Sequence, residues 1–189
     1  MTNLNADYVS TWYGDIAQPL FERFAAIKLV VCDIDGVFSD GRIYLGNNGE
    51  ELKAFHTRDG FGVKALINAG IEVAVITGRR SAIVENRMSA LGVQHIFQGQ
   101  EDKLSCFEQL AKQLNLAASD IASIGDDIPD LDMLKASGLA VAVQDAHPYV
   151  QQHAHYITAQ RGGFGAVREL SDLILTAQGQ LQLHGGVSL

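Results

Sequence analysis

Two carboxylates, Asp33 and Asp35, stand two positions apart at the end of a short apolar run. The run, residues 29–32, is typical of a buried strand in a parallel sheet. In an extended chain this spacing places both acids on one side, and Gly36 then lets the backbone turn away. Because charged groups are almost never buried unpaired, we predict that Asp33 is a nucleophile and Asp35 its proton-handling partner. A helix cap or an Asx-turn is the structural alternative for such acids.

Other polar residues follow later apolar runs. Thr77 ends one run, Asp126 and Asp127 end another, and Lys103 begins a predicted helix. If the strands are parallel, these residues converge with Asp33 at one edge of the sheet. Two carboxylates about 4 Å apart repel by about 4 kcal/mol at an effective dielectric constant of 20, so the cluster requires a cation. Oxygen ligands without His or Cys favour Mg²⁺.

This set of groups suits phosphoryl transfer. Asp33 would attack phosphorus and form an aspartyl-phosphate. Lys103, the Thr77 hydroxyl and the cation would stabilise negative charge on the phosphoryl oxygens. Asp35 would protonate the leaving alkoxide and then deprotonate the water that cleaves the intermediate. The residues therefore predict a Mg²⁺-dependent phosphatase.

The elements that position these groups alternate between strand and helix along the chain, which predicts an α/β fold with a parallel sheet. Its 189 residues fit one domain, residues 27–177, with a helical lead-in over residues 1–26 and a flexible tail over residues 178–189. An Asn-Gly pair predicts a β-hairpin insertion at about 38–56, too small to be a cap domain. After residues 29–32, further strands are predicted at 71–76, 93–97, 121–124, 139–143 and 156–158, and helices at 61–68, 81–91, 101–114, 129–136 and 166–177.

Charge and composition narrow the choice of partners. The net charge of -8 argues against nucleic acid or an anionic membrane as the main partner. No apolar segment is long enough to span a bilayer, and the N-terminus does not resemble a signal peptide. The two cysteines lack metal-ligand spacing, so we expect reduced thiols in a cytoplasmic protein. Six cationic residues between positions 58 and 103 suggest a local positive lobe for a small anionic substrate, although scattered surface charge is the alternative.

Four motifs resemble those of the haloacid dehalogenase (HAD) superfamily in the same order. They are DIDGV, the ITGR stretch that holds Thr77, Lys103, and GDDxxD at residues 125–130. The resemblance implies a doubly wound, Rossmann-like sheet with helices on both faces. It also implies an Asp33 nucleophile, with Mg²⁺ held by Asp33, the backbone carbonyl of Asp35, and Asp126.

Longer stretches, among them DGVFSDGRIYLGNNGEELKAF and GGFGAVRE, resemble the bacterial phosphatases of 3-deoxy-D-manno-octulosonate 8-phosphate (KDO 8-phosphate). This implies hydrolysis of a sugar-acid phosphate to KDO and phosphate, in cytoplasmic synthesis of a lipopolysaccharide precursor. It also implies a homotetramer in which hairpins close neighbouring active sites. Arginine can grip a carboxylate with two hydrogen bonds. The residues and the resemblance together predict substrate binding by Asp35, His56, Thr57, Arg58, Asp59, Gly60, Lys64, Thr77, Gly78, Arg79, Arg87 and Lys103.

Alternatives stay open at this stage. The motifs hardly separate a KDO 8-phosphate phosphatase from a phosphatase for a nine-carbon, sialic-acid-type sugar, or from the phosphatase-like domain found beside sugar-nucleotide synthetases. A non-catalytic oligomeric scaffold is a further class, although the intact acid set speaks against it. The hairpin could instead fold over its own domain. The glycines at 162, 163 and 165 could form an anion nest, and the resemblance places this segment and the tail near an adjacent active site.

Overall fold

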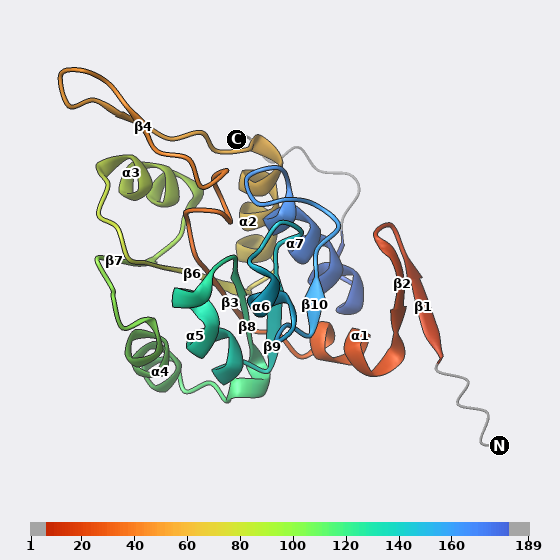
Figure 1. Ribbon diagram of the computed structural model, residues 1–189. Coiled ribbons are helices and arrows are strands. Elements are labelled where there is room, and N and C mark those ends of the chain that lie inside the picture. The colour runs from red at the N-terminus through yellow and green to blue at the C-terminus, as the bar shows by residue number, and fades with distance from the viewer. Residues whose placement is uncertain (1–6, 182–189) are drawn as a thin grey trace.

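The central sheet grows from strand β3 (Leu29–Cys32), whose four residues are all buried. The computed structural model describes residues 7–181. Six parallel strands pair in one sheet. Strand β3 lies inside this sheet (Figure 1). Their order is β10 (Tyr156–Ile157), β9 (Leu139–Ala142), β8 (Ile121–Gly125), β3, β6 (Glu72–Thr77) and β7 (His95–Gln98).

Helices cover both faces of this sheet, because successive side chains of a strand point to opposite sides. Val30 and Cys32 of β3 join one apolar cluster, whereas Leu29 and Val31 join the other. The prediction of a doubly wound parallel sheet is confirmed. The first cluster includes residues of α1 (Gln18–Ala25), α2 (Thr57–Asn68), α3 (Ala82–Leu91) and α7 (Ala166–Ala177), and the second those of α4 (Lys103–Gln113) and α5 (Leu131–Ala136).

The strand order reverses next to β3. The chain runs outward from β3 through β6 to β7, then returns to β8 on the other side of β3. Such a reversal opens a crevice beyond the carboxyl ends of the two central strands, and ligands of open α/β sheets bind there. The fold thus places the segments after β3 and β8 side by side, as their pairing shows.

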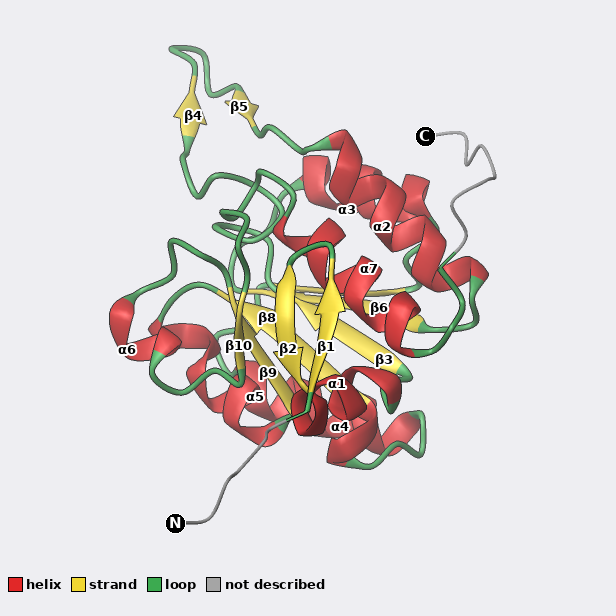
Figure 2. Cartoon of the chain, turned by 90° about the vertical axis from the view of Figure 1, so that its right-hand side faces the viewer, coloured by secondary structure: helices red, strands yellow, loops and turns green. Residues whose placement is uncertain are grey.

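A small hairpin interrupts the connection between β3 and α2. Its strands, β4 (Tyr44–Leu45) and β5 (Glu51–Leu52), have two residues each. Figures 1 and 2 show it projecting away from the sheet, so it does not fold over its own domain. Within residues 7–181 it is the insertion found at this point, and no larger cap accompanies it.

The helical lead-in predicted for residues 1–26 is wrong over its first part. Residues 8–17 form an antiparallel hairpin, β1 (Tyr8–Thr11) and β2 (Gly14–Ala17), and only α1 is helical. Gly14, with a φ of 109°, makes the turn between them possible. Pro19 does not break a helix but lies in the first turn of α1, where its missing N–H costs nothing. Residues 1–6 lie outside the described part of the chain.

Other predicted elements are confirmed with shifted ends. The helix predicted from residue 61 begins at Thr57, because the His56 ring caps it by accepting from the Arg58 N–H at 3.1 Å. The helix predicted from 129 starts as the 3₁₀ turn η2 (Ile128–Asp130). Short elements that no pattern predicted are η1 (Ala118–Asp120) and α6 (Pro148–Gln151).

The first residue of the predicted tail, Gln178, is held by a hydrogen bond to the rest of the domain. The Gln178 side chain donates to the Ile27 carbonyl at 2.7 Å, just past the end of α7. Residues 182–189 lie outside the described part, so the flexibility predicted for residues 178–189 stays a prediction, as do the predicted domain boundaries. Within residues 7–181, no helix is both long and apolar enough to cross a membrane.

Candidate active site

Asp33 lies at the switch point, one residue past β3. Its backbone N–H donates to the Ile124 carbonyl of β8 at 3.1 Å, which extends the strand pairing to the acid itself. Its side chain is buried, and one carboxylate oxygen accepts a hydrogen bond from Lys103 Nζ at 2.8 Å. Lys103 is the first residue of α4, and the Asp102 side chain caps that helix. The predicted convergence of Lys103 with Asp33 is therefore confirmed, and the two side chains are in direct contact.

Asp126 and Asp130 follow β8 and complete a cluster with Asp33. Carboxylate oxygens of these three residues all lie within 4.8 Å of one another. Asp130 is locked in place, because Lys103 Nζ donates to one of its oxygens at 2.6 Å and the Asp126 N–H to the other at 2.9 Å. The proximity of Asp33 and Asp126, which the sequence predicts, is confirmed. Asp130 belongs to the GDDxxD motif but was not assigned a role.

The electrostatics of the cluster show that it needs positive charge. Burial and the charge of Asp130 raise the pKa of Asp33 to about 6. Burial, then Asp130 and Asp33, raise the pKa of Asp126 to about 8. Burial lowers the pKa of Lys103, but the two acids that it contacts outweigh burial and raise it overall. One lysine does not neutralise three carboxylates, so the donor set fits a divalent cation with a preference for oxygen ligands.

Gly36 allows the loop after β3 to pass close to this cluster. Its φ is 92°, which favours glycine, and a side chain at this position would overlap the Asp126 carboxylate. The turn predicted at Gly36 is thus confirmed. The close approach of Asp126 is a second reason why this position holds a glycine. Any larger residue would push the loop that carries Asp35 away from Asp126.

Asp35 follows Asp33 by two residues, and 23% of its side chain is exposed. Lys53 of the hairpin stem forms an ion pair and hydrogen bond with its Oδ1. Arg79 Nε lies 3.8 Å from Oδ2, and the Ser39 hydroxyl lies 3.4 Å from Oδ1. Asp35 is therefore not an Asx-turn residue or a helix cap, because its oxygens bind side chains rather than the local backbone.

A pocket of about 540 Å³ collects these groups at the carboxyl edge of the sheet. Thr77, Gly78 and Arg79, predicted from the ITGR stretch, line it together with Asp33, Asp35 and Asp126. The same pocket contains residues that sequence reasoning did not assign to the substrate. They are Gly41, Gln100, Glu101, Asp127, Pro129 and Asp130, and only GDDxxD and the neighbourhood of Lys103 hinted at them.

The other predicted substrate-binding residues do not line this pocket. Of these, His56 caps α2, Thr57 is its first residue, and Lys64 is half-buried farther along it. Arg58 Nη2 donates to the Phe164 carbonyl at 3.1 Å and borders a different hollow, which shares no lining residue with the catalytic pocket.

Asp59, Gly60 and Arg87 have structural contacts in the single chain. Asp59 is buried and accepts from the Arg168 N–H at the start of α7 at 2.8 Å. Burial raises the pKa of Asp59 to about 6. The Arg87 guanidinium covers Gly60, at a position that a larger side chain would have to share. These contacts give each residue a role in packing, whereas their contact with substrate stays a prediction.

The glycine segment at residues 162–165 packs on the catalytic loop of its own chain. A side chain on Gly162 would overlap the Gly36 carbonyl, and the Gly163 N–H donates to the Val37 carbonyl at 2.8 Å. The Gly162 N–H donates to Asp145 at 2.9 Å. These N–H groups are therefore already satisfied, and the predicted anion nest is wrong for them.

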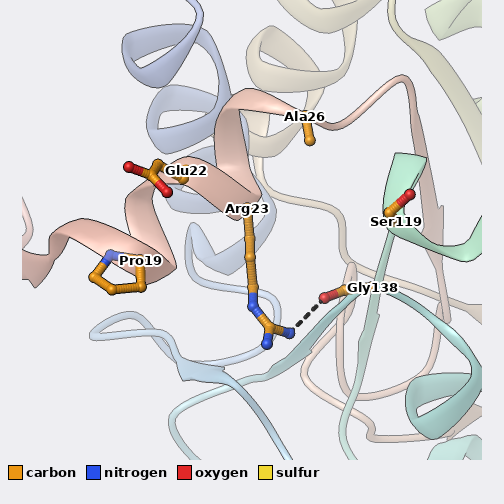
Figure 3. Close-up of a pocket in the computed structure, with 6 residues that line it drawn as sticks. All are labelled: Pro19, Glu22, Arg23, Ala26, Ser119 and Gly138. Carbon is orange, nitrogen blue, oxygen red and sulfur yellow. Dashed lines mark hydrogen bonds between the residues drawn. The ribbon is translucent and has the colours of Figure 1, made fainter.

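Another hollow, of about 400 Å³, lies at the opposite edge of the sheet, where α1 precedes β3 (Figure 3). Arg23 points into it and donates to the Gly138 carbonyl at 2.9 Å. The remaining lining residues are Pro19, Glu22, Ala26 and Ser119. Glu22 is the one acid in this lining, so the hollow lacks the cluster of acids found at the carboxyl edge.

Fold and site define a class of protein before any relative is considered: a doubly wound sheet with an aspartate nucleophile candidate and further acids at its switch point. Consistent with this, the family model described as haloacid dehalogenase-like hydrolase matches residues 89–168. A protein of Yersinia pestis named 3-deoxy-D-manno-octulosonate 8-phosphate phosphatase KdsC is 49% identical, over 98% of this chain and 99% of its own length. The protein of the same name from Escherichia coli strain K12 is 46% identical over 96% of each chain.

Solved structures agree with these relatives. The crystal structure of the Yersinia pestis phosphatase has a TM-score of 0.95 and covers 98% of this chain and 100% of its own. The Moraxella catarrhalis phosphatase, in complex with magnesium ion, phosphate ion and KDO, has a TM-score of 0.84 at 43% identity, with 85% and 92% covered. The chain therefore belongs to the 3-deoxy-D-manno-octulosonate 8-phosphate phosphatase family of the haloacid dehalogenase-like hydrolases.

Proposed function

We propose that this protein hydrolyses KDO 8-phosphate to KDO and inorganic phosphate, with Asp33 as the covalent nucleophile. The observation that carries the proposal is the meeting of Asp33, Lys103, Asp126 and Asp130 at the switch point of a family member. Its place in the synthesis of a lipopolysaccharide precursor follows from the substrate. A cytoplasmic location is part of the same proposal.

Asp33 attacks the phosphorus atom, and the bond from phosphorus to the sugar oxygen breaks. Lys103 is placed to donate to Asp33 and to an oxygen of the phosphoryl group, because its amine already lies 2.8 Å from the nucleophile. Thr77 lines the same pocket, and its hydroxyl is available to a second phosphoryl oxygen. The fixed positions of these groups lower the barrier, since they need little reorganisation during the reaction.

Asp35 handles the proton in both steps. It protonates the alkoxide as the sugar leaves, and as a carboxylate it then removes a proton from the water that attacks the phosphorylated Asp33. Its carboxylate lines the pocket and is partly exposed, whereas Asp33 is buried. This difference separates the two roles: the buried acid is held for attack, and the more open acid can exchange protons with water.

Mg²⁺ fits the acid cluster, and Asp33 and Asp126, with the backbone carbonyl of Asp35, would hold it. When bound, it neutralises negative charge on the phosphoryl oxygens. Asp130 acts as a positioning residue, because its oxygens already accept from Lys103 and from the Asp126 N–H. The raised pKa values of Asp33 and Asp126 support this assignment, since a bound cation favours their ionised forms.

The sugar-acid part of the substrate extends from the phosphoryl site toward Arg79, which lines the pocket and can bind a carboxylate. Residues 56–60, Lys64 and Arg87 do not line the pocket of the single chain, so they cannot bind the substrate in that pocket without a neighbouring chain. We propose that they complete the site once neighbouring chains assemble.

A homotetramer in which hairpins close neighbouring pockets would supply that assembly. The hairpin exposes apolar side chains that a single chain leaves in water, with Leu45 73% and Leu52 68% exposed. Ile43 and Tyr44 add to this surface. An apolar patch on a projecting element is typical of a protein interface. In such an assembly, the hairpin of one chain would cover the open pocket of its neighbour and would bury its own apolar side chains.

The test is a comparison of kcat/KM for KDO 8-phosphate, a nine-carbon sialic acid 9-phosphate and hexose phosphates, each with and without Mg²⁺. We expect KDO 8-phosphate to exceed the others by at least roughly tenfold, a difference of about 1.4 kcal/mol, and the activity to require Mg²⁺. A higher kcat/KM for the nine-carbon substrate would reassign the substrate. Absence of phosphate release from all of them would contradict the proposed activity and favour a scaffold.

A further inference from the structure

Lys53 is a buried cation that the proposed mechanism does not use. It follows β5 directly, and its side chain is 2% exposed. Its ammonium forms an ion pair with the Asp35 carboxylate, yet Lys53 is not among the residues that line the pocket. It therefore contacts the acid from behind rather than from the side of the substrate.

Burying a charge costs free energy, so the ion pair between Lys53 and Asp35 indicates that the two side chains fix each other's positions. A buried ammonium without a partner is strongly unfavourable, so Lys53 and Asp35 hold each other in one arrangement. The other side chains near Asp35 bind it more weakly, with the Ser39 hydroxyl at 3.4 Å and Arg79 at 3.8 Å. Lys53 is thus the main side-chain anchor of Asp35 in the described residues.

The hairpin stem also holds a second pocket residue. Glu51 of β5 lies 3.4 Å from Arg79 Nη2, and Arg79 lines the pocket beside Asp35. Two charges of one short segment, Glu51 and Lys53, thus bind two neighbouring side chains of the site. A displacement of the stem would move both.

We propose that Lys53 is a positioning residue that aims the Asp35 carboxyl group at the leaving oxygen of the substrate, so that the protonated acid gives its proton to that oxygen and is left as the carboxylate. The inference rests on the proposed function, because it presumes that Asp35 protonates the leaving group. It also gives the hairpin a role within its own chain, since its stem fixes the acid while its tip remains available to a neighbour.

The experiment uses two substrates that differ in their need for a proton. The sugar alkoxide of KDO 8-phosphate leaves only with protonation, whereas the phenolate of p-nitrophenyl phosphate leaves without it. In Lys53→Met, we expect kcat/KM for KDO 8-phosphate to fall by roughly 10- to 100-fold. The value for p-nitrophenyl phosphate should fall less than threefold, and KM for KDO 8-phosphate should rise no more than twofold. Lys112→Met removes an exposed lysine of α4 and is the matched control.

Two further variants keep the result interpretable. Lys53→Arg retains the charge and should recover part of the lost kcat/KM. In the Asp35→Asn background, Lys53→Met should cause no additional loss, because the group that it positions is already absent. If Lys53→Met is not folded at the assay temperature by circular dichroism, Lys53→Gln is measured in its place.

Equal losses on both substrates, a rise in KM alone, or full activity of Lys53→Met would overturn the inference. Inactivity of the unmodified protein toward KDO 8-phosphate would instead contradict the proposed function. The two failures are therefore distinguishable in one series of assays.

Discussion

The pocket around Asp33 and the hairpin β4–β5 differ in what they bury and what they expose. In the pocket, Asp33 and Lys103 are buried and held by hydrogen bonds from separate elements. In the hairpin, strands of two residues carry Leu45 and Leu52 into solvent. The pocket contains negative charge that requires a cation, and the hairpin exposes apolar surface that is suited to contact with a partner chain.

This difference between pocket and hairpin indicates which parts of the proposed function a single chain can perform without a neighbour. The groups for phosphoryl transfer are already assembled within a single chain, because they follow adjacent strands of one sheet. Recognition of the sugar acid is less complete, since Arg79 lines the pocket whereas Arg58, Lys64 and Arg87 do not. Chemistry should therefore depend on the pocket residues and on Lys53 of the hairpin stem, and substrate affinity on the exposed tip of the hairpin.

The largest effect is expected for Asp33→Asn. The amide cannot act as the nucleophile, so kcat should fall by roughly 10⁴-fold or more. The free energy of unfolding of the metal-free protein should stay equal or increase, because the change removes one charge from a repelling cluster. Steady-state kinetics and thermal unfolding measure the two quantities, and retained activity would remove Asp33 from its role.

Asp35→Asn should have the next largest effect. Loss of general acid and base catalysis lowers kcat by roughly 10²- to 10⁴-fold. Asp35 does not belong to the cluster of three acids, so Mg²⁺ affinity measured by calorimetry should change little. A rate near that of the unmodified protein would move the proton transfer to another group.

The hairpin side of the comparison is tested by the double variant Leu45→Ser and Leu52→Ser. Since both side chains are exposed in the single chain, the thermal midpoint of the isolated fold should change little. Light scattering should show a smaller assembly, and KM for KDO 8-phosphate should rise by roughly tenfold. Tyr149→Ser, at another half-exposed position, is the control. Unchanged KM in a confirmed monomer would separate the hairpin from substrate binding.

The last prediction concerns stability rather than activity: the free energy of unfolding of the metal-free protein depends on pH. An acid with a raised pKa binds its proton more tightly in the folded state than in the unfolded chain. The free energy of unfolding should therefore fall as pH rises from the ordinary pKa of 3.8 to about 8, the value of Asp126.

The slope of this decline is at most about 1.4 kcal/mol per pH unit for one group. Asp126→Asn should flatten the decline, and added Mg²⁺ should raise the thermal midpoint more at pH 8 than at pH 5.5. Parallel pH profiles for the variant and the unmodified protein would contradict the assignment of Asp126.

Sequence reasoning predicted the sheet and the acid cluster because both depend on local signals. An apolar run such as residues 29–32 ends in an acid, and parallel strands bring such ends together. The same rule placed Thr77 at the pocket. The order of the strands, which places β3 beside β8, came from the structure and not from the sequence.

The missed features depend on contacts that spacing does not encode. The apolar residues of the N-terminal hairpin have a spacing close to that of a helix. The hairpin is held by a distant contact, because the Tyr13 hydroxyl donates to the Asp172 carboxylate, 159 positions away, at 2.7 Å. Lys53 and Asp35 meet only because the stem of the hairpin returns to the catalytic loop. Likewise, residues 56–60 were assigned by resemblance, and the single chain does not bring them to the pocket.

The most direct test of the account is detection of a phosphorylated Asp33 during turnover. The protein is mixed with KDO 8-phosphate and Mg²⁺, quenched rapidly in acid, and reduced with borohydride, which converts an aspartyl-phosphate to homoserine. Peptide mass mapping should then find homoserine at position 33, and Asp33→Asn should show none. Turnover without modification at this position, or with modification at another carboxylate, would contradict the account.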